Sequence, residues 1–148
     1  MAKKREGPAK IDTLIHDADY VVTMNKDREI LTDGAVAVHR GKIVEVGKSA
    51  ALKKKYTNVK NKIRARDRLV MPGLINAHMH STQQLARGLA DCVFLPTWIH
   101  DRLFPWENAL SEEEVYLSSM ACCIELIRTG STCFDDPGGY NMHRAVQA

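Results

Sequence analysis

The sequence predicts an α/β chain in which a small all-β module precedes the opening of a parallel sheet. Short apolar runs separated by turn residues fill residues 11–71. A strand, a long capped helix and a second strand follow in order within residues 72–148, as in a sheet whose strands run parallel. The chain has 148 residues, about one ordinary domain, and its last helical pattern reaches residue 148 without a stop signal. We therefore expect an incomplete chain, the opening part of a larger protein.

The all-β module is predicted from compact apolar runs and one turn. Its expected strands are residues 11–16, 20–24, 35–39, 42–46 and 69–71. The Arg-Gly pair at residues 40–41 favours a hairpin, because glycine readily takes a positive φ. Residues 49–56 are expected to form one short helix, and the polar residues 1–10 a disordered tail. Proline and glycine at residues 72–73 then interrupt the pattern, so we place a domain boundary there.

The second half contains the clearest helix signal of the chain. Its expected elements are a strand over residues 74–77, helices over 83–89, 96–103 and 111–129, a strand over 131–134 and a helix from 141. Ser111 and Glu114 have the spacing of a capping box, in which each side chain bonds the other residue's backbone N–H. Gly130 suits the helix end. The predicted buried stripe of this helix is Leu117, Met120, Ala121, Ile124 and Ile127.

His78 and His80 are the most informative residues of the chain. They follow the apolar run at residues 69–75, with Asn-Ala between. Residues two apart in extended chain point to the same face, so both imidazoles can reach one metal ion. Neutral imidazole is a good ligand for zinc and also for iron or nickel. In a parallel α/β barrel, reactive groups lie where these histidines are expected, at the C-terminal end of a strand.

Other ligand candidates are weaker. His100 and His143 are isolated in the sequence, and we expect surface or packing roles for them. Asp135 and Asp136 follow the second strand of the pair, where loop or capping roles are favoured over a contribution to the site. A catalytic zinc typically has about three protein ligands, so two histidines are too few. No general base can be assigned either, and no catalytic residue is predicted.

Composition argues against several classes of protein. Residues 1–68 hold 17 Lys/Arg against 9 Asp/Glu, but aromatic residues that could stack on bases are not interleaved with them, so we expect no nucleic-acid partner. No apolar run reaches the roughly 18 residues needed to cross a membrane. The polar N-terminus lacks the apolar core of a secretory signal, which makes a cytoplasmic location the default expectation.

Residues 71–80 (MPGLINAHMH) resemble the first-strand signature of the metal-dependent amidohydrolase superfamily. Downstream, residues 87–91 (RGLAD), Trp98, residues 103–107 (LFPWE) and residues 111–136 are similar to the 5-methylthioadenosine/S-adenosylhomocysteine deaminases and their chlorohydrolase-like relatives. The resemblance covers about residues 11–148. It implies that residues 11–71 are the N-terminal part of a small β-sandwich and that residues 72–148 are the first βα units of a (β/α)8 TIM-type barrel.

The resemblance also implies a site and a reaction. His78 and His80 would bind a divalent metal, with zinc the first choice and iron or nickel the alternatives, and Glu107 would hold the ribose hydroxyls of a purine nucleoside. Hydroxide generated at the metal would attack the amino-bearing carbon of adenine. The alternatives are a guanine deaminase or triazine hydrolase of the same subgroup, or a catalytically inactive truncated fragment. The family's later metal ligands and its acid/base residue have no counterpart in residues 1–148, so we expect this chain alone to be inactive. The complete protein could form a homo-oligomer.

Overall fold

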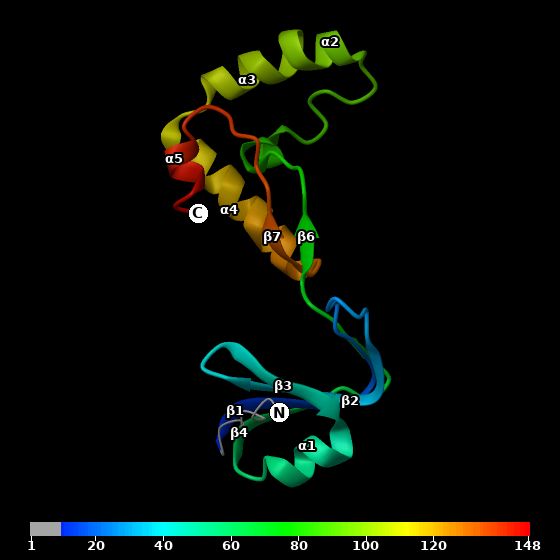
Figure 1. Cartoon of the computed structure of the whole chain (residues 1–148). Coiled ribbons are helices and arrows are strands. Elements are labelled where there is room, and N and C mark those ends of the chain that lie inside the picture. The colour runs from blue at the N-terminus through cyan, green and yellow to red at the C-terminus, as the bar shows by residue number, and fades with distance from the viewer. Residues whose placement is uncertain (1–9) are drawn as a thin grey trace. The chain divides into compact units, whose positions relative to one another are not determined.

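The computed structural model describes residues 10–148 and confirms the mixed α/β class (Figure 1). The chain divides into two compact units, one ending at Pro72 and the other running from Gly73 to Ala148. We call them the β unit and the α/β unit, and each is described by itself. The predicted N-terminal tail, apart from Lys10, lies outside the described residues. No helix within residues 10–148 is both long and apolar enough to cross a membrane.

The β unit is one five-stranded sheet with a single helix. Its elements are β1 (Ile11–Val22), β2 (Ile30–His39), β3 (Lys42–Lys48), α1 (Ser49–Lys55), β4 (Val59–Arg64) and β5 (Leu69–Val70). The strand order is β3-β2-β1-β4, and β5 pairs with the far end of β1. β1 runs antiparallel to β2 but parallel to β4 and β5.

The predicted hairpin is confirmed, and the first two predicted strands prove to be one. Arg40 and Gly41 both have positive φ, 48° and 71°, as the tight turn between β2 and β3 requires. The apolar runs at residues 11–16 and 20–24 lie within the single strand β1 or at its end. A bulge between Ile15 and Ala18 shifts its register against β2. The extra residue at the bulge changes which sheet face the following side chains occupy. The apolar residues before and after the bulge therefore do not follow one continuous two-residue alternation.

Sequence reasoning missed β4. Its sequence, VKNKIR, carries three cationic residues and only two apolar ones, which is a weak strand signal. The parallel ladder with β1, from Ile11↔Val59 to His16↔Arg64, holds it in the sheet instead. The predicted helix over residues 49–56 is confirmed as α1.

The two faces of this sheet bury different clusters. The cluster between the sheet and α1 consists of Ile11, Leu14, Ala35, Ala37, Leu52 and Tyr56, all at most 3% exposed. Val36 lies between Ala35 and Ala37 on β2 and so points to the opposite face of the sheet. There it belongs to a second cluster with Ala18, Val21 and Ala65. That second face keeps an apolar hollow of about 200 Å³, so it is less well filled than the face under α1.

Asp17 fastens the β1 bulge to α1. With a φ of 57°, it points its carboxylate at Lys53 Nζ (2.6 Å) and Ser49 Oγ (2.9 Å). The Asp17 N–H donates to the same Ser49 hydroxyl at 2.8 Å. Hydrogen bonds from Lys53, then from Ser49, hold the pKa of Asp17 well below its ordinary value.

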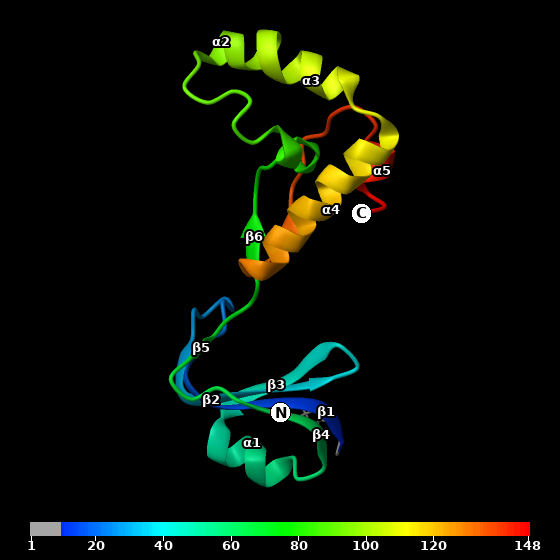
Figure 2. The same cartoon turned by 180° about the vertical axis from the view of Figure 1, so that it is seen from behind.

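The α/β unit pairs two short parallel strands with a long helix. Its elements are β6 (Leu74–Asn76), the 3₁₀ turn η1 (Ser81–Ala86), α2 (Leu95–Thr97), the π-helical turn η2 (Trp98–Leu103), α3 (Phe104–Ala109), α4 (Glu112–Arg128), β7 (Ser131–Phe134) and α5 (Met142–Ala145). The predicted parallel pairing of β6 with β7 is confirmed. Figures 1 and 2 show α4 alongside this pair from both sides. Glycine is required at Gly73, because a Cβ there would lie 2.2 Å from Thr132.

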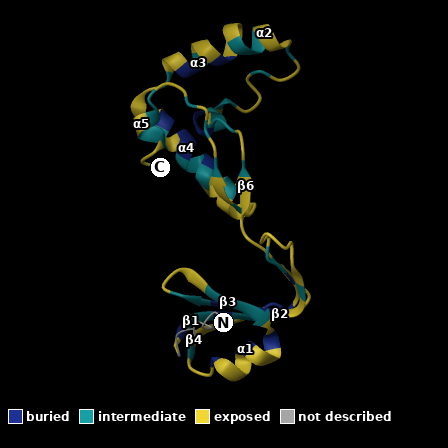
Figure 3. Ribbon diagram, viewed as in Figure 1, coloured by how far each residue is buried: buried dark blue, intermediate teal, exposed yellow. Residues whose placement is uncertain are grey.

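The predicted ends of α4 are confirmed, whereas its predicted buried face is wrong. Ser111 and Glu114 form the capping box, and Gly130 follows the helix with a φ of 91°. The buried residues are Val115, Ser118, Ser119 and Cys122. Of the predicted stripe, Leu117, Ile124 and Ile127 are 51%, 52% and 73% exposed. Figure 3 shows buried, intermediate and exposed residues along α4. Small hydroxyl residues let η1 approach closely, a role that a hydrophobicity pattern does not register.

Two other helices differ from expectation. Residues 83–89 were expected to be helical, but the turn begins at Ser81 and is a 3₁₀ turn ending at Ala86. The helix predicted over 96–103 is longer: α2, η2 and α3 form one helical run from Leu95 to Ala109. Pro96 and Pro105 do not break this run, since each stands at the first turn of its helical segment, where no N–H donor is needed.

Candidate functional site

His78 and His80 lie just beyond the C-terminal end of β6. The strand stops at Asn76, whose side-chain Oδ1 accepts the His78 N–H at 3.2 Å. The two imidazole ring centroids are 5.2 Å apart with planes at 89°. The pair is therefore close in space although it lies in a bend after the strand rather than on the strand's pleat.

The loop after β7 fixes the position of His80. The Nδ1 atom of His80 lies 3.4 Å from the carbonyl oxygen of Gly138 in that loop. A proton on Nδ1 would point at that carbonyl and leave the lone pair of Nε2 available to a ligand. The backbone ladder continues past both strands, with Asp135 N–H donating to Asn76 O (2.8 Å) and Met79 N–H to Asp135 O (3.1 Å). Two strand ends are thus held together where the histidines emerge.

Asp136 connects the same loop to η1. Its Oδ2 accepts both the N–H and the hydroxyl of Ser81, at 3.0 and 2.6 Å, and its Oδ1 accepts the Gly138 N–H at 3.0 Å. Burial acts to raise the pKa of Asp136, but the hydrogen bonds from Ser81 and Gly138 outweigh it and keep that pKa below its ordinary value. Asp136, for which the sequence favoured a loop or capping role, is therefore an ionised clamp between the loop after β7 and η1, beside His80.

Buried hydroxyls fasten η1 to α4. Ser118 donates to Thr82 O at 2.7 Å and accepts the Leu85 N–H at 3.2 Å. Ser119 and Ser81 have their hydroxyl oxygens 3.3 Å apart. All of these serines are buried, so each bond forms away from water, where losing a partner would be costly. The turn that follows His80 consequently has a rigid support.

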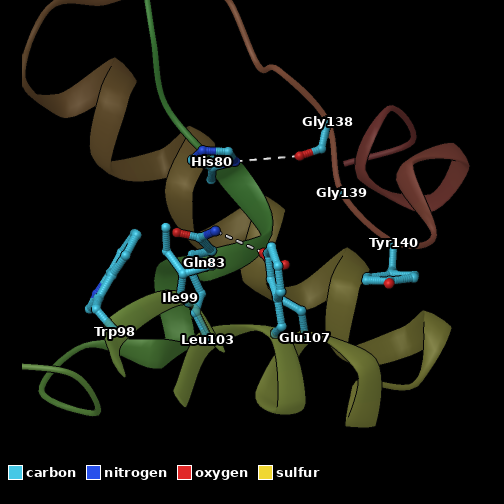
Figure 4. A pocket seen from close by; sticks show the side chains of 10 residues that line it. His80, Gln83, Trp98, Ile99, Leu103, Glu107, Gly138, Gly139 and Tyr140 are labelled. Carbon is cyan, nitrogen blue, oxygen red and sulfur yellow. Dashed lines mark hydrogen bonds between the residues drawn. The ribbon is translucent and has the colours of Figure 1, made fainter. Parts of the chain in front are cut away.

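A cavity of about 450 Å³ opens beside His80 (Figure 4). It is lined by His80, Gln83, Trp98, Ile99, Leu103, Phe104, Glu107, Gly138, Gly139 and Tyr140. The apolar wall comes from the continuous helical run of α2, η2 and α3. A mostly apolar hollow with a few polar groups is the usual form of a small-molecule site, and its size falls in the usual range of about 300–1,000 Å³.

Glu107 is the buried acid of this cavity. It is 7% exposed, and its Oε1 accepts a hydrogen bond from Gln83 Nε2 at 2.8 Å. The structure thus brings Glu107 and His80 to one cavity, although they are far apart in the sequence. Gln83 was missed by sequence reasoning, since a glutamine three residues after a histidine has no recognised spacing.

The remaining candidates lie elsewhere. His100 makes an edge-on contact with Phe104 at 5.7 Å between ring centroids, and His143 faces Glu112 with Nε2 and Oε1 3.5 Å apart. Asp135 is exposed. Among residues 10–148, no group of three or more His, Cys, Asp or Glu side chains is placed to hold a metal ion. In the described part of the chain, the two histidines remain the paired candidates.

Two imidazoles at a strand's carboxyl end, beside a cavity in a parallel α/β unit, define the class of α/β proteins whose sites gather at strand ends. Comparison with known proteins identifies the family within that class. The chain belongs to the Amidohydrolase family, whose profile matches residues 69–148. The resemblance noted in the sequence is thereby confirmed.

Several relatives are similar over most of this chain. A 5-methylthioadenosine/S-adenosylhomocysteine deaminase of Nitratidesulfovibrio vulgaris is 40% identical over 129 residues, 87% of this chain and 29% of the relative. A 5'-deoxyadenosine deaminase of Methanosarcina barkeri is 38% identical over 139 residues, 93% of this chain and 31% of the relative. The chain therefore spans about three-tenths of the length of these relatives.

Solved structures agree with the fold. A zinc-bound adenosine deaminase from Xanthomonas campestris superimposes with a TM-score of 0.84 at 31% identity, covering 95% of this chain and 32% of that one. A triazine hydrolase from Arthrobacter aurescens has a TM-score of 0.77 at 22% identity, covering 91% of this chain and 32% of that one. At that identity the second likeness concerns the fold alone.

Proposed function

We propose that the intact protein is a metal-dependent hydrolase that deaminates an adenine nucleoside of the 5-methylthioadenosine/S-adenosylhomocysteine type. The observation that carries the proposal is a single cavity lined both by His80, with His78 beside it, and by the buried carboxylate of Glu107. The names of the most similar relatives, deaminases of adenine nucleosides, support the same substrate class.

In this proposal His78 and His80 hold a divalent metal, for which zinc is the first choice and iron or nickel the alternatives. The donor set suits such an ion, because both ligands are imidazoles and the Gly138 carbonyl can hold His80 in the tautomer that leaves Nε2 free. When bound, the metal lowers the pKa of a coordinated water and so supplies a nucleophile at neutral pH. The zinc bound by the Xanthomonas campestris deaminase supports this choice.

The cavity residues would bind and orient the nucleoside. Trp98 and the neighbouring apolar side chains offer a surface for the purine ring, and the Glu107 carboxylate accepts hydrogen bonds from the two ribose hydroxyls. Water replaces the exocyclic amino group: a C–O bond forms, the C–N bond breaks, and the nitrogen leaves as ammonia with protons from water. We assign the proton transfer to no residue between 10 and 148, because Glu107, the only carboxylate lining the cavity, is given to the ribose.

The two enzymatic alternatives fit the cavity less well. A guanine base or a triazine has no hydroxyl pair, so it would leave the buried Glu107 carboxylate without a ligand partner. The carboxylate would then keep its hydrogen bond from Gln83 but gain none from the ligand, so such ligands should bind less tightly than a riboside. The triazine hydrolases share the fold, but this likeness does not extend to substrate.

We also propose that residues 11–71 are part of a β-sandwich and residues 72–148 the first βα units of a (β/α)8 barrel. The support is the exposed apolar face of α4 and the edges of the two-stranded sheet, which a larger barrel would cover. On this proposal the 148-residue chain by itself would release no ammonia from any nucleoside. A purified 148-residue chain with metal-dependent deaminase activity would contradict it.

The test of the proposed function is an ammonia-release assay on the intact protein. Methylthioadenosine, S-adenosylhomocysteine, 5'-deoxyadenosine, guanine and a chlorotriazine would be compared before and after chelation and reconstitution with zinc. We expect release from the adenine nucleosides, lost on chelation and restored by zinc. Turnover of guanine or the triazine in preference to the nucleosides would reject the proposal.

A further inference from the structure

We propose that Gln83 is a positioning residue that holds the Glu107 carboxylate in place to accept a pair of hydroxyls, and so sets a preference for ribosides. This inference rests on the proposed function, which seats the nucleoside in the cavity. Sequence patterns do not single out Gln83. Its side chain lines the cavity where η1, the turn after His80, faces α3 (Figure 4).

The geometry joins Gln83 to both ends of the site. Its backbone N–H donates to His80 O at 3.2 Å, so the turn that carries His80 also fixes the Cα of Gln83. Its side-chain Nε2 donates to Glu107 Oε1 at 2.8 Å. In the part of the chain that is described, this is the hydrogen bond that links η1 with α3.

The support beneath Gln83 is rigid. Ser81 and Thr82, the two residues before it, are 2% and 3% exposed and are bonded to Asp136 and Ser118. Orienting groups act best when their own conformation is locked by packing and hydrogen bonds. The amide of Gln83 therefore projects from a fixed turn towards a carboxylate on a separate helix.

The chemistry of the partner explains why an amide suits this position. A carboxylate offers about four acceptor sites, and the neutral amide occupies one without cancelling the charge. Within residues 10–148, no Lys, Arg or His nitrogen forms an ion pair with Glu107. Oε1 is thus restrained while Oε2 keeps its full strength as an acceptor. Hydroxyl donors on adjacent carbons of a ribose would complete the coordination of this buried charge.

The test compares two neighbouring glutamines in the intact protein. Gln83→Met removes the amide at nearly constant length, and Gln84→Met is the matched control. Gln84 follows Gln83 in the same turn, but its Nε2 donates to Glu125 and it does not line the cavity. The substrates are 5'-deoxyadenosine, which has both ribose hydroxyls, and 2',3'-dideoxyadenosine, which has neither.

We expect Gln83→Met to lower kcat/KM for the diol substrate about tenfold or more, mainly through KM, because a hydrogen bond to a buried charge is lost. The dideoxy substrate should change less than about twofold, and Gln84→Met should leave the ratio of the two substrates unchanged. Equal losses on both substrates would overturn the inference, since a merely structural role would not distinguish them.

A double-mutant cycle separates action through Glu107 from direct contact. With Glu107→Gln already present, Gln83→Met should cost little more, less than about twofold, whereas full additivity would overturn the inference. If Gln83→Met fails to fold, Gln83→Glu replaces it, and the repulsion between two carboxylates should give the same selective loss. Failure of the proposed function would look different: the unmodified protein would then deaminate neither nucleoside.

Discussion

The β unit buries mainly apolar side chains, whereas most of the buried side chains of the α/β unit are polar. Among residues 10–72 of the β unit, the buried residues are apolar except for Ser49. In the α/β unit the buried residues are Ser81, Thr82, Leu103, Glu107, Val115, Ser118, Ser119 and Cys122. One unit is thus stabilised by ordinary apolar burial, the other by directed polar bonds that converge on His80 and the cavity. The buried polar residues of the α/β unit lie next to His80 and the cavity, where their hydrogen bonds fix the geometry of the site.

The largest effect should come from removing the paired histidines. In the intact protein, His78→Ala or His80→Ala should lose the metal and nearly all turnover, because no other pair of imidazoles within the described residues can replace them. Elemental analysis of each purified variant measures this. His100→Ala, which alters a histidine in edge-on contact with Phe104, is the control and should retain its metal. Unchanged metal content in both site variants would defeat the assignment.

The next largest effect concerns Glu107, a buried polar residue of the α/β unit that lines the cavity. Glu107→Gln should lower kcat/KM for adenine nucleosides about a hundredfold, since two charge-assisted hydrogen bonds to the ribose are weakened. The free base adenine, which has no hydroxyls, should be affected far less. Steady-state kinetics on both substrates measures the ratio. A similar loss on nucleoside and base would refute the ribose role of Glu107.

The apolar side of the comparison is tested in the β unit. Leu14→Ala should lower the free energy of unfolding by about 3 kcal/mol, because Leu14 is fully buried under α1 and truncation leaves a cavity. Leu69→Ala is the control: Leu69 is 52% exposed, and its truncation should cost less than about 1 kcal/mol. Urea unfolding of the intact protein gives both values, and similar losses would mean that burial does not decide them.

The clamp at Asp136 should have a slightly smaller effect on stability. Asp136→Asn puts amide hydrogens or a weaker acceptor against the Ser81 and Gly138 donors, at a cost of about 2 kcal/mol. Asp135→Asn, one residue earlier and exposed, should change stability by less than about 0.5 kcal/mol. If the two variants melt alike, the Asp136 bonds do not stabilise the unit.

The smallest effect concerns pH and the Asp17 cluster. The folded-state pKa of Asp17 is lowered, so its contribution is fully present above the unfolded pKa and is lost as pH falls through the folded value. Asp17→Asn should therefore flatten the fall in stability at acidic pH and leave the profile between pH 6 and 8 parallel to the unmodified protein. Chemical unfolding at several pH values checks this. The variant should be less stable than the unmodified protein at neutral pH, and the two should converge as the pH falls. A difference that is as large in acid as at neutral pH, or a steeper fall of the variant in acid, would refute the role of Asp17.

Local signals made part of this structure predictable. The β2–β3 hairpin follows from Arg40 and Gly41 between apolar runs, and the capped start of α4 follows from Ser111 and Glu114. β4 could not be predicted, because its strand conformation depends on the ladder with β1 rather than on its own residues. The buried face of α4 was missed because serines, not apolar residues, meet η1.

The candidate site divides in the same way. His78 and His80 are two residues apart, so their spacing alone predicts metal binding. The role of Glu107 was predicted only from the family resemblance. Gln83 was not singled out, and Asp136 was predicted to have a loop or capping role without its partner Ser81, because the partners of these residues lie 24 and 55 residues away in the chain. Such pairings arise only when separate elements are brought together, so sequence patterns identify the histidines but not the side chains that hold their surroundings.

The π-helical turn η2 lies within the helical wall of this cavity. Trp98, Leu103 and Glu107 share one wall although the helical run from Leu95 to Ala109 contains a widened turn. A π-helical turn holds about one residue more than an α-helical turn, so deleting one residue within η2 would return the run to α-helix and leave Trp98 and Glu107 in nearly the same relative orientation. The wall therefore tolerates a change of length at η2, whereas a one-residue deletion in α3 before Glu107 would turn this carboxylate about 100° away from the cavity.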